Sequence, residues 1–373
     1  MMIDNIAKEV ICFKGNFPVG NLCIYIDCGA NRDNKKNGIS HMCEHFYIKL
    51  LSSQYMSNVK DDNFRCVGYT DYMYTVINIT FTESETNLQK LIEAIHIQDI
   101  TSEEGNIFYE KSKKEIIMEC KLRKDEIKKS LKVNSFIADK RIDYVPLGNI
   151  KMINSISYLE IIDFLRSNYR DFRCVFLLKQ SHNIDSFCKE KDKTDNFQRI
   201  FDNNIHGIHT CKISNDNKQK SYFQIRNNTH IYYLCMALIE HVFIKKIENQ
   251  LGLNVYFMKK KISNVNLYEI LCLENKSKNM NDVVQFIINN KINEEDLIST
   301  KEEFIKHLHD DTLVDLNYAI NNIINYFVYG ESLLLDEKYI QKVIADLKRI
   351  SISQVNQIKN ETFNSSYWIL LGY

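Results

Sequence analysis

The chain has 373 residues, of which 45% are hydrophobic and 26% are charged, a composition typical of an ordinary globular protein. Its 48 basic and 48 acidic residues cancel, which gives no reason to expect a nucleic acid or an anionic membrane as a partner. No apolar run reaches the roughly 18–20 residues of a membrane span, and the N-terminus lacks a basic-then-apolar signal segment. The 11 cysteines are scattered, with no C-x-x-C pair, which favours reduced thiols. We therefore expect a cytoplasmic protein that does not bind membranes.

The most informative stretch comes early in the chain, after a strand expected over residues 21–30. It reads His41-Met42-Cys43-Glu44-His45, so two imidazoles and a carboxylate fall within one short segment in the order H-x-x-E-H. Ser40 is a natural N-cap, and a helix from there places both histidines one turn apart with the glutamate beside them. Such a group can hold zinc and take a proton from an attacking water. The alternative is a chance pattern on an amphipathic helix.

A zinc site of this kind needs a third protein ligand. The best candidates lie in a long charged helix expected over residues 109–120, which carries Glu115 and Glu119. These two glutamates are four positions apart and share a helix face, so spacing alone allows either of them to face the metal. Taken singly, each reads as a solvated helix carboxylate.

The combination resembles a known family. An H-x-x-E-H motif, followed 74 positions after its second histidine by a helical glutamate in a K-K-E-I-I-x-E context, is similar to the pitrilysin family of zinc peptidases. That family includes insulysin and the mitochondrial processing peptidases. The resemblance implies that His41, His45 and Glu119 hold Zn²⁺ and that Glu44 is the catalytic base. Glu115 is then a second-shell or structural residue.

The chain departs from the family pattern at one single residue and at one pair of residues. The acidic residue that often lies seven positions before the third ligand is Ser112 here. The segment 68–81 resembles the strand along which substrate peptides pair, and its Thr, Tyr, Val and Ile content independently favours a strand. Val67-Gly68 replaces the usual Asn-Ala pair just before the Tyr-Thr of that strand.

The resemblance also implies the substrate contacts. In this chain they fall on Tyr69, Thr70 and Tyr74 in the strand segment, and on Tyr256 in the second half of the chain. In the family, a second-half arginine accompanies that tyrosine and helps to hold the developing oxyanion.

The arginine is missing from this chain. Its position falls at Glu248 or Asn249, and the nearby Lys245 and Lys246 are point charges that do not reproduce a guanidinium fork. We therefore expect a homologous second subunit to supply the Arg/Tyr half, as a heterodimer in preference to a homodimer.

The order of expected elements repeats faintly in the two halves of the chain. We predict an α+β fold with two similar sandwich domains, each an antiparallel-rich β-sheet covered by helices. The N-terminal zinc-binding domain is expected over residues 1–190, a linker over 191–214 and the C-terminal domain over 215–373.

The expected function is that of the zinc-bearing subunit of a small two-subunit bacterial peptidase. Such a subunit would hydrolyse unfolded peptides, in particular to process or remove the leader of a ribosomally made peptide. The alternative is a non-catalytic structural or peptide-binding subunit of the same fold, because the family contains relatives that keep the fold and lose the chemistry.

Overall fold

The computed structural model describes residues 7–33, 36–95, 102–137, 144–170, 172–179, 209–211, 218–224, 229–262, 265–273, 280–310, 316–329, 337–363 and 368–371. The chain divides into two compact units. Within the described ranges, no helix is both long enough and apolar enough to cross a bilayer.

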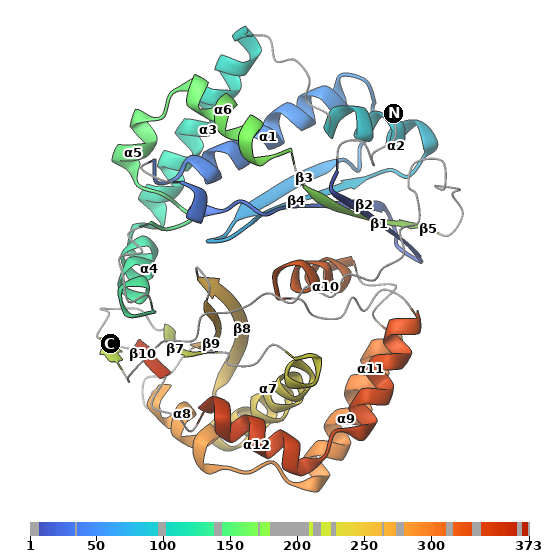
Figure 1. Ribbon diagram of the computed structural model, residues 1–373, viewed down its shortest axis with the longest axis vertical. Coiled ribbons are helices and arrows are strands. Elements are labelled where there is room, and N and C mark those ends of the chain that lie inside the picture. Colours follow the sequence, from blue (N-terminus) through green and yellow to red (C-terminus); the bar gives the residue numbers. More distant parts are fainter. Residues whose placement is uncertain are drawn as a thin grey trace. The chain divides into compact units, whose positions relative to one another are not determined.

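The first unit is built on a five-stranded sheet. Its strands are β1 (Glu9–Gly15), β2 (Gly20–Ile26), β3 (Arg65–Thr70), β4 (Thr75–Phe81) and β5 (Arg173–Lys179). They follow the order β1-β5-β2-β4-β3, in which β1 and β5 are parallel and all other neighbours are antiparallel (Figure 1). The antiparallel-rich sheet confirms the expected fold class, and the order leaves β3 at an edge.

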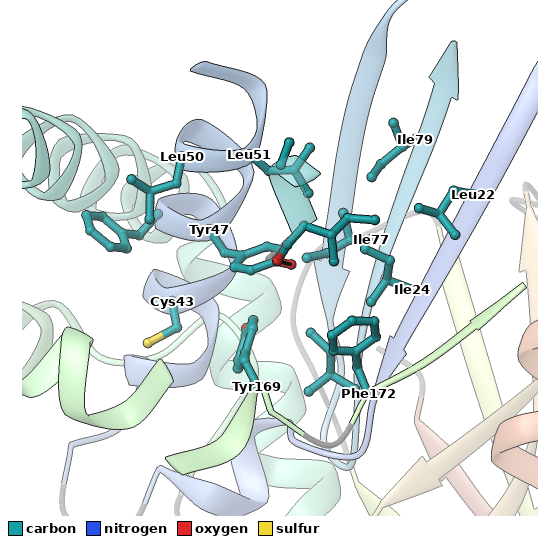
Figure 2. Packing of buried hydrophobic residues seen from close by; sticks show 14 of the residues in the cluster. Leu22, Ile24, Cys43, Tyr47, Leu50, Leu51, Ile77, Ile79, Tyr169 and Phe172 are labelled. Carbon is teal, nitrogen blue, oxygen red and sulfur yellow. Dashed lines mark hydrogen bonds between the residues drawn. The ribbon is translucent and has the colours of Figure 1, made fainter. Parts of the chain in front are cut away.

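Helices cover both faces of this sheet. The helices of the first half of the chain are α1 (Ile39–Met56), α2 (Glu85–Ile95), α3 (Ser102–Leu122), α4 (Lys124–Ile137), α5 (Ile150–Ser155) and α6 (Tyr158–Asn168), with a short turn of 3-10 helix over Ala30–Arg32. Of these, α1 makes the most extensive contacts with the sheet, through β3 and β4. Figure 2 shows α1 packed on the sheet, with Tyr47, Leu50 and Leu51 in the same buried cluster as Leu22 and Ile77. This packing fixes α1, which carries the H-x-x-E-H motif, against the strands.

The opposite face of the sheet receives α10 (Leu316–Tyr329), a helix from the second half of the chain that belongs to the first unit. Successive side chains of a strand point to opposite faces of the sheet. Ile24 and Ile26 point to the face covered by α1, so Tyr25 between them points to the face covered by α10. The ring of Phe327 stacks on Tyr25 at 5.0 Å between centroids, and the Arg173 guanidinium lies over both rings. With helices on both faces, every residue of β2 is buried.

The expectation of one continuous strand over residues 68–81 is wrong. This segment contributes to two strands, β3 and β4, joined by a tight turn that the Asp71 N–H closes by donating to the Tyr74 carbonyl at 2.8 Å. Within the turn, the Asp71 carboxylate accepts the Tyr72 N–H at 2.7 Å. Tyr69 and Thr70 therefore end the edge strand β3, and Tyr74 lies across the turn.

The second unit repeats the topology of the first. Its strands are β6 (His209–Cys211), β7 (Lys218–Gln224), β8 (Asn254–Ile262), β9 (Val265–Leu273) and β10 (Trp368–Leu371). The order β6-β10-β7-β9-β8 matches the first sheet strand for strand, and again only the first pair is parallel. Its helices are α7 (His230–Leu251), α8 (Met280–Asn289), α9 (Glu294–Asp310), α11 (Glu337–Arg349) and α12 (Ile352–Phe363). Two similar sandwich units are thus present, as expected.

The expected domain boundaries at residues 190 and 215 stay a prediction. Most of the expected linker, residues 191–208 and 212–214, lies outside the described residues. Its residues 209–211 form β6, which pairs with β10.

Candidate metal centre

The helix that carries the motif begins one residue earlier than its expected cap. Gly38, with φ +105°, is the N-cap of α1, so the expectation that Ser40 caps the helix is wrong. The capping oxygens come from Asp33, which accepts the Gly38 N–H at 2.6 Å and the Ser40 N–H at 3.0 Å. The Ser40 hydroxyl donates to the Gly29 carbonyl at 2.7 Å. These bonds tie the first turn of α1, and with it His41, to the loop that follows β2.

His41, Glu44 and His45 lie on neighbouring positions of α1, as the spacing predicts. The two imidazole rings are 4.9 Å apart between centroids and nearly perpendicular. His41 and Glu44 are buried, whereas His45 is partly exposed. The group therefore lies at the boundary between the core and solvent, where a metal ion and a water molecule could both reach it.

Glu119 of α3 meets both rings. Its carboxylate oxygens lie 3.6 Å from His41 Nε2 and 3.5 Å from His45 Nε2. Ligand atoms about 2.1 Å from a tetrahedral zinc ion are about 3.4 Å from one another, so these separations fit a shared ion. Among the residues that the structure describes, no other group of three or more His, Cys, Asp or Glu side chains comes together in this way. The donor set therefore fits zinc.

Electrostatics keep the first histidine in its ligand form. Burial, with a smaller contribution from the neighbouring charges of His45 and Arg123, lowers the pKa of His41 to about 3. A neutral imidazole has a free lone pair, which a metal ligand requires. His41 can therefore coordinate a cation throughout the neutral pH range.

Glu115 lies against the other side of His45. Its Oε2 is 3.1 Å from His45 Nδ1 and 2.6 Å from the Lys49 ammonium. Although burial opposes ionisation, the hydrogen bonds from Lys49 and His45 hold the pKa of Glu115 below its usual value. Glu115 thus contacts the ring nitrogen of His45 that does not face Glu119, and its expected role, orienting the ligand or purely structural, stays a prediction. Ser112 is fully buried and its hydroxyl makes no hydrogen bond within the described part of the chain.

Glu44 is held from the side of the sheet. Its Oε2 is 4.0 Å from His41 Nε2 and accepts a hydrogen bond from Thr70 Oγ1 at 2.9 Å. Burial raises the pKa of Glu44 to about 8; the Thr70 hydroxyl opposes this rise and the charge of Glu119 adds to it. A carboxyl with a pKa near neutrality, next to possible metal ligands, is suited to exchanging protons.

Gly68 is a residue of this site that the sequence did not reveal. A Cβ at this position would lie 2.9 Å from Glu44 Oε1 and 2.9 Å from Ile48 Cδ1. Any side chain here would press on the Glu44 carboxylate, so the glycine lets the edge strand approach α1 closely. A glycine inside a predicted strand was the available signal.

The substrate residues expected from the resemblance lie on and beside the edge strand. Residues of β3 alternate in exposure, with Val67 and Tyr69 exposed on one face and Gly68 and Thr70 turned toward α1. The Tyr69 ring packs edge-on against the buried ring of Tyr74, with 5.9 Å between centroids. The backbone edge of β3 therefore runs past Glu44 through Gly68 and Thr70.

Tyr256 belongs to the second unit. It lies on β8, the corresponding edge strand of the second sheet, with half of its side chain exposed. The lysines that could replace the missing arginine are both occupied, because Lys245 pairs with Glu303 and Lys246 lies 2.5 Å from Asp296. Neither lysine is a ready substitute for a free guanidinium.

No protein-family model matches the sequence, and no curated protein matches it. The fold, in contrast, is well represented among solved structures. A protease from Helicobacter pylori is similar with a TM-score of 0.70 and 12% sequence identity, over 97% of this chain and 95% of that one. The first half of the periplasmic protease PqqL from Escherichia coli has a TM-score of 0.69 and 12% identity, over 97% and 89% of the two chains.

An inactive peptidase domain from Pseudomonas fluorescens is also similar, with a TM-score of 0.67 and 11% identity, over 97% of this chain and 95% of that one. These neighbours are pitrilysin-like peptidases and inactive domains of the same kind. The chain therefore has the fold of pitrilysin-like peptidases, a fold that occurs with and without activity.

Proposed function

We propose that this chain is the zinc-bearing subunit of a metallopeptidase that hydrolyses unfolded peptides. The observation that carries the proposal is the convergence of His41, His45 and Glu119 from two helices at separations that suit one zinc ion. Glu44 beside them would be the general base of the reaction. The inactive relatives of this fold make the side chains of the site, and not the fold, the argument for activity.

In the proposed mechanism His41, His45 and Glu119 hold the metal. When bound, zinc supplies a Lewis acid that polarises the scissile carbonyl and lowers the pKa of water toward about 7. Glu44 accepts a proton from the attacking water and delivers it to the leaving amine. Thr70 orients the carboxylate of Glu44 through its hydrogen bond. Glu115 orients the ring of His45.

The substrate in this proposal is an extended peptide added as a further strand beside β3. An edge strand has unpaired backbone N–H and C=O groups, which bind a peptide with little demand on its sequence. Because β3 passes Glu44 at Gly68 and Thr70, a peptide paired there would place its backbone near the proposed metal. Tyr69 would contact the peptide at the strand end, with its ring supported by the buried ring of Tyr74.

We further propose that a homologous partner subunit supplies an arginine for the oxyanion. The support is the absence of an arginine near Tyr256 in the sequence and the engagement of Lys245 and Lys246 with carboxylates of α9. Processing of a ribosomally made peptide is the activity that we propose for the pair. A reducing, cytoplasmic setting is part of this proposal, and the described cysteines are free thiols.

Metal content and peptide cleavage test the proposal together. The purified chain should contain one zinc ion, measured by mass spectrometry of the metal. With its partner it should cleave unfolded peptides, and a chelator should stop the cleavage. The chain alone should cleave poorly, so full activity without a partner would refute the split arrangement.

The second candidate is a non-catalytic subunit, which the inactive domain of the same fold supports. A zinc-bound chain that yields no cleaved product with its partner would indicate a peptide-binding subunit. A chain with neither zinc nor cleavage would indicate a structural one.

A further inference from the structure

One carboxylate oxygen of Glu115 contacts two basic side chains. Glu115 Oε2 lies 3.1 Å from His45 Nδ1 and 2.6 Å from Lys49 Nζ. His45 and Lys49 are four positions apart on α1 and so share a helix face, while Glu115 reaches them from α3. The carboxylate therefore bridges the two helices at the height of the proposed metal centre.

The shared oxygen determines which nitrogen of His45 faces the metal. A carboxylate only accepts hydrogen bonds, so the proton of the neutral ring must lie on Nδ1 when Glu115 binds it. The lone pair is then on Nε2, the atom that lies 3.5 Å from Glu119. Hydrogen bonding of the second ring nitrogen to a carboxylate is a common way to orient a metal-binding histidine.

Lys49 is the group that keeps Glu115 in place. The Glu115 side chain is about half exposed, and without a partner it could turn into solvent, away from the ring. The Lys49 side chain is less exposed and forms the shorter of the two contacts. An isolated ion pair at a protein surface contributes little to stability. This one differs because its carboxylate also holds a candidate metal ligand.

We propose that Lys49 is a positioning residue for the metal centre, which acts through Glu115 to fix the ring of His45 with Nε2 toward a bound divalent cation. The inference rests on the proposed zinc function. It assigns a role to a residue outside the motif that sequence reasoning did not select.

Zinc affinity of the purified full-length chain tests the inference without any measurement of activity. In a competition titration with a chromogenic chelator, Lys49→Met should raise the zinc dissociation constant about 10-fold, and Glu115→Gln about 10- to 100-fold. The double variant should bind zinc no more weakly than Glu115→Gln alone, because Lys49 acts through that carboxylate. Lys49→Arg, which keeps the charge, should restore most of the affinity.

A matched control is Lys90→Met. Lys90 pairs with Glu93 at 2.8 Å on α2, so this change also removes a lysine ion pair from the first unit, and zinc affinity should not change. Thermal unfolding of the metal-free proteins checks that each variant is folded. If Lys49→Met does not fold, Lys49→Gln, which keeps a polar end, makes the same comparison.

Unchanged zinc affinity in the Lys49 variant would overturn the inference and leave the metal centre standing. Equal losses on removing Lys49 with and without Glu115 would also overturn it, since the two residues would then act independently. A wild-type chain that binds no zinc would overturn the proposed function and this inference with it.

Discussion

The helix pair of the first unit that carries the candidate metal centre has a counterpart in the second unit. On α1 and α3, His41 and His45 stand one turn apart and face Glu119. On α7 and α9, His241 and Lys245 stand one turn apart and face Glu303. The two helix pairs occupy corresponding places in the chain order of their units, although His241 lies near the middle of its helix and His41 near the start.

The two helix pairs differ in the contacts that their glutamate makes. Glu303 accepts a hydrogen bond from His241 Nε2 at 2.9 Å and is in direct contact with the Lys245 ammonium. Lys245, and secondarily His241, lower the pKa of Glu303 to about 2. The oxygens of Glu119 are 3.5 and 3.6 Å from their nearest imidazole nitrogens, longer than charge-assisted hydrogen bonds. The second group forms an ion pair by itself, whereas the separations in the first group leave room for the proposed cation.

The largest effect is expected at Glu44. At the corresponding position of α7, one residue before Lys245, the chain has Ile244. Glu44→Gln should lower the turnover number by about 10²- to 10⁴-fold, because the amide cannot accept the proton of the attacking water. Zinc content should remain at the wild-type level. Peptide cleavage and metal analysis of the same preparation measure both, and substantial remaining turnover would contradict the role of Glu44.

The comparison predicts different results at the two facing glutamates. Glu119→Ala should weaken zinc binding by at least about 100-fold, more than the loss of a residue that only orients a ligand, because a proposed ligand is lost. Glu303→Ala should leave zinc affinity unchanged, since Glu303 is already paired with the positively charged Lys245. Competition titration of both variants provides the measurement. If the two variants bound zinc with similar affinity, Glu119 would not be a metal ligand that distinguishes the first helix pair from the second.

A smaller effect is expected at Gly68. A methyl group there would lie 2.9 Å from an oxygen of Glu44 and displace that carboxylate. Gly68→Ala should therefore lower the turnover number about 10-fold with little change in KM, since this displacement costs only part of the general-base contribution. Val67→Ala, at the neighbouring exposed position, is the control. A fall of similar size in the control would point to disturbance of β3 as a whole.

The smallest effect concerns stability and pH, with opposite signs in the two units. Burial raises the pKa of Asp33 to about 6 against the hydrogen bonds from Ser40 and Gly38. The folded state then binds a proton more tightly than the unfolded one, so stability decreases as pH rises from about 4 to about 6. The change should be about 1–3 kcal/mol. Glu303, with a lowered pKa, should instead lose its contribution as pH falls from about 4 toward 2.

Denaturant unfolding at several pH values measures these changes. Asp33→Asn should flatten the dependence between pH 4 and 6, and Glu303→Gln should flatten it below pH 4. An unaltered slope in Asp33→Asn would show that this carboxyl does not titrate on folding.

The sequence predicts those parts of the site whose residues are brought together by the period of a single helix. His41, Glu44 and His45 are adjacent in one helix, and the charged pattern around Glu119 predicts a second helix. The meeting of these helices came from the resemblance, because nothing in local spacing specifies which face of α3 turns toward α1. The structure brings them together.

The sequence did not predict contacts between residues that are distant along the chain. It also did not predict a turn that lies within a run of strand-forming residues. Asp33 caps α1 from seven positions before Ser40, across a loop that local capping rules do not span. Lys49 has the i,i+4 spacing from His45 but reads as an ordinary solvated lysine until Glu115 is placed. The turn from Asp71 to Tyr74 lies within a run of strand-forming residues, so the hairpin was read as one strand.

The placement of α10 bears on how the chain folds during synthesis. Phe327 covers Tyr25 and Arg173 of a sheet whose strands are all complete by Lys179. A ribosome must therefore add about 150 more residues before that sheet receives its last helix, roughly ten seconds at usual elongation rates. A nascent chain or fragment that ends before Leu316 would leave this aromatic surface open to water and to chaperones.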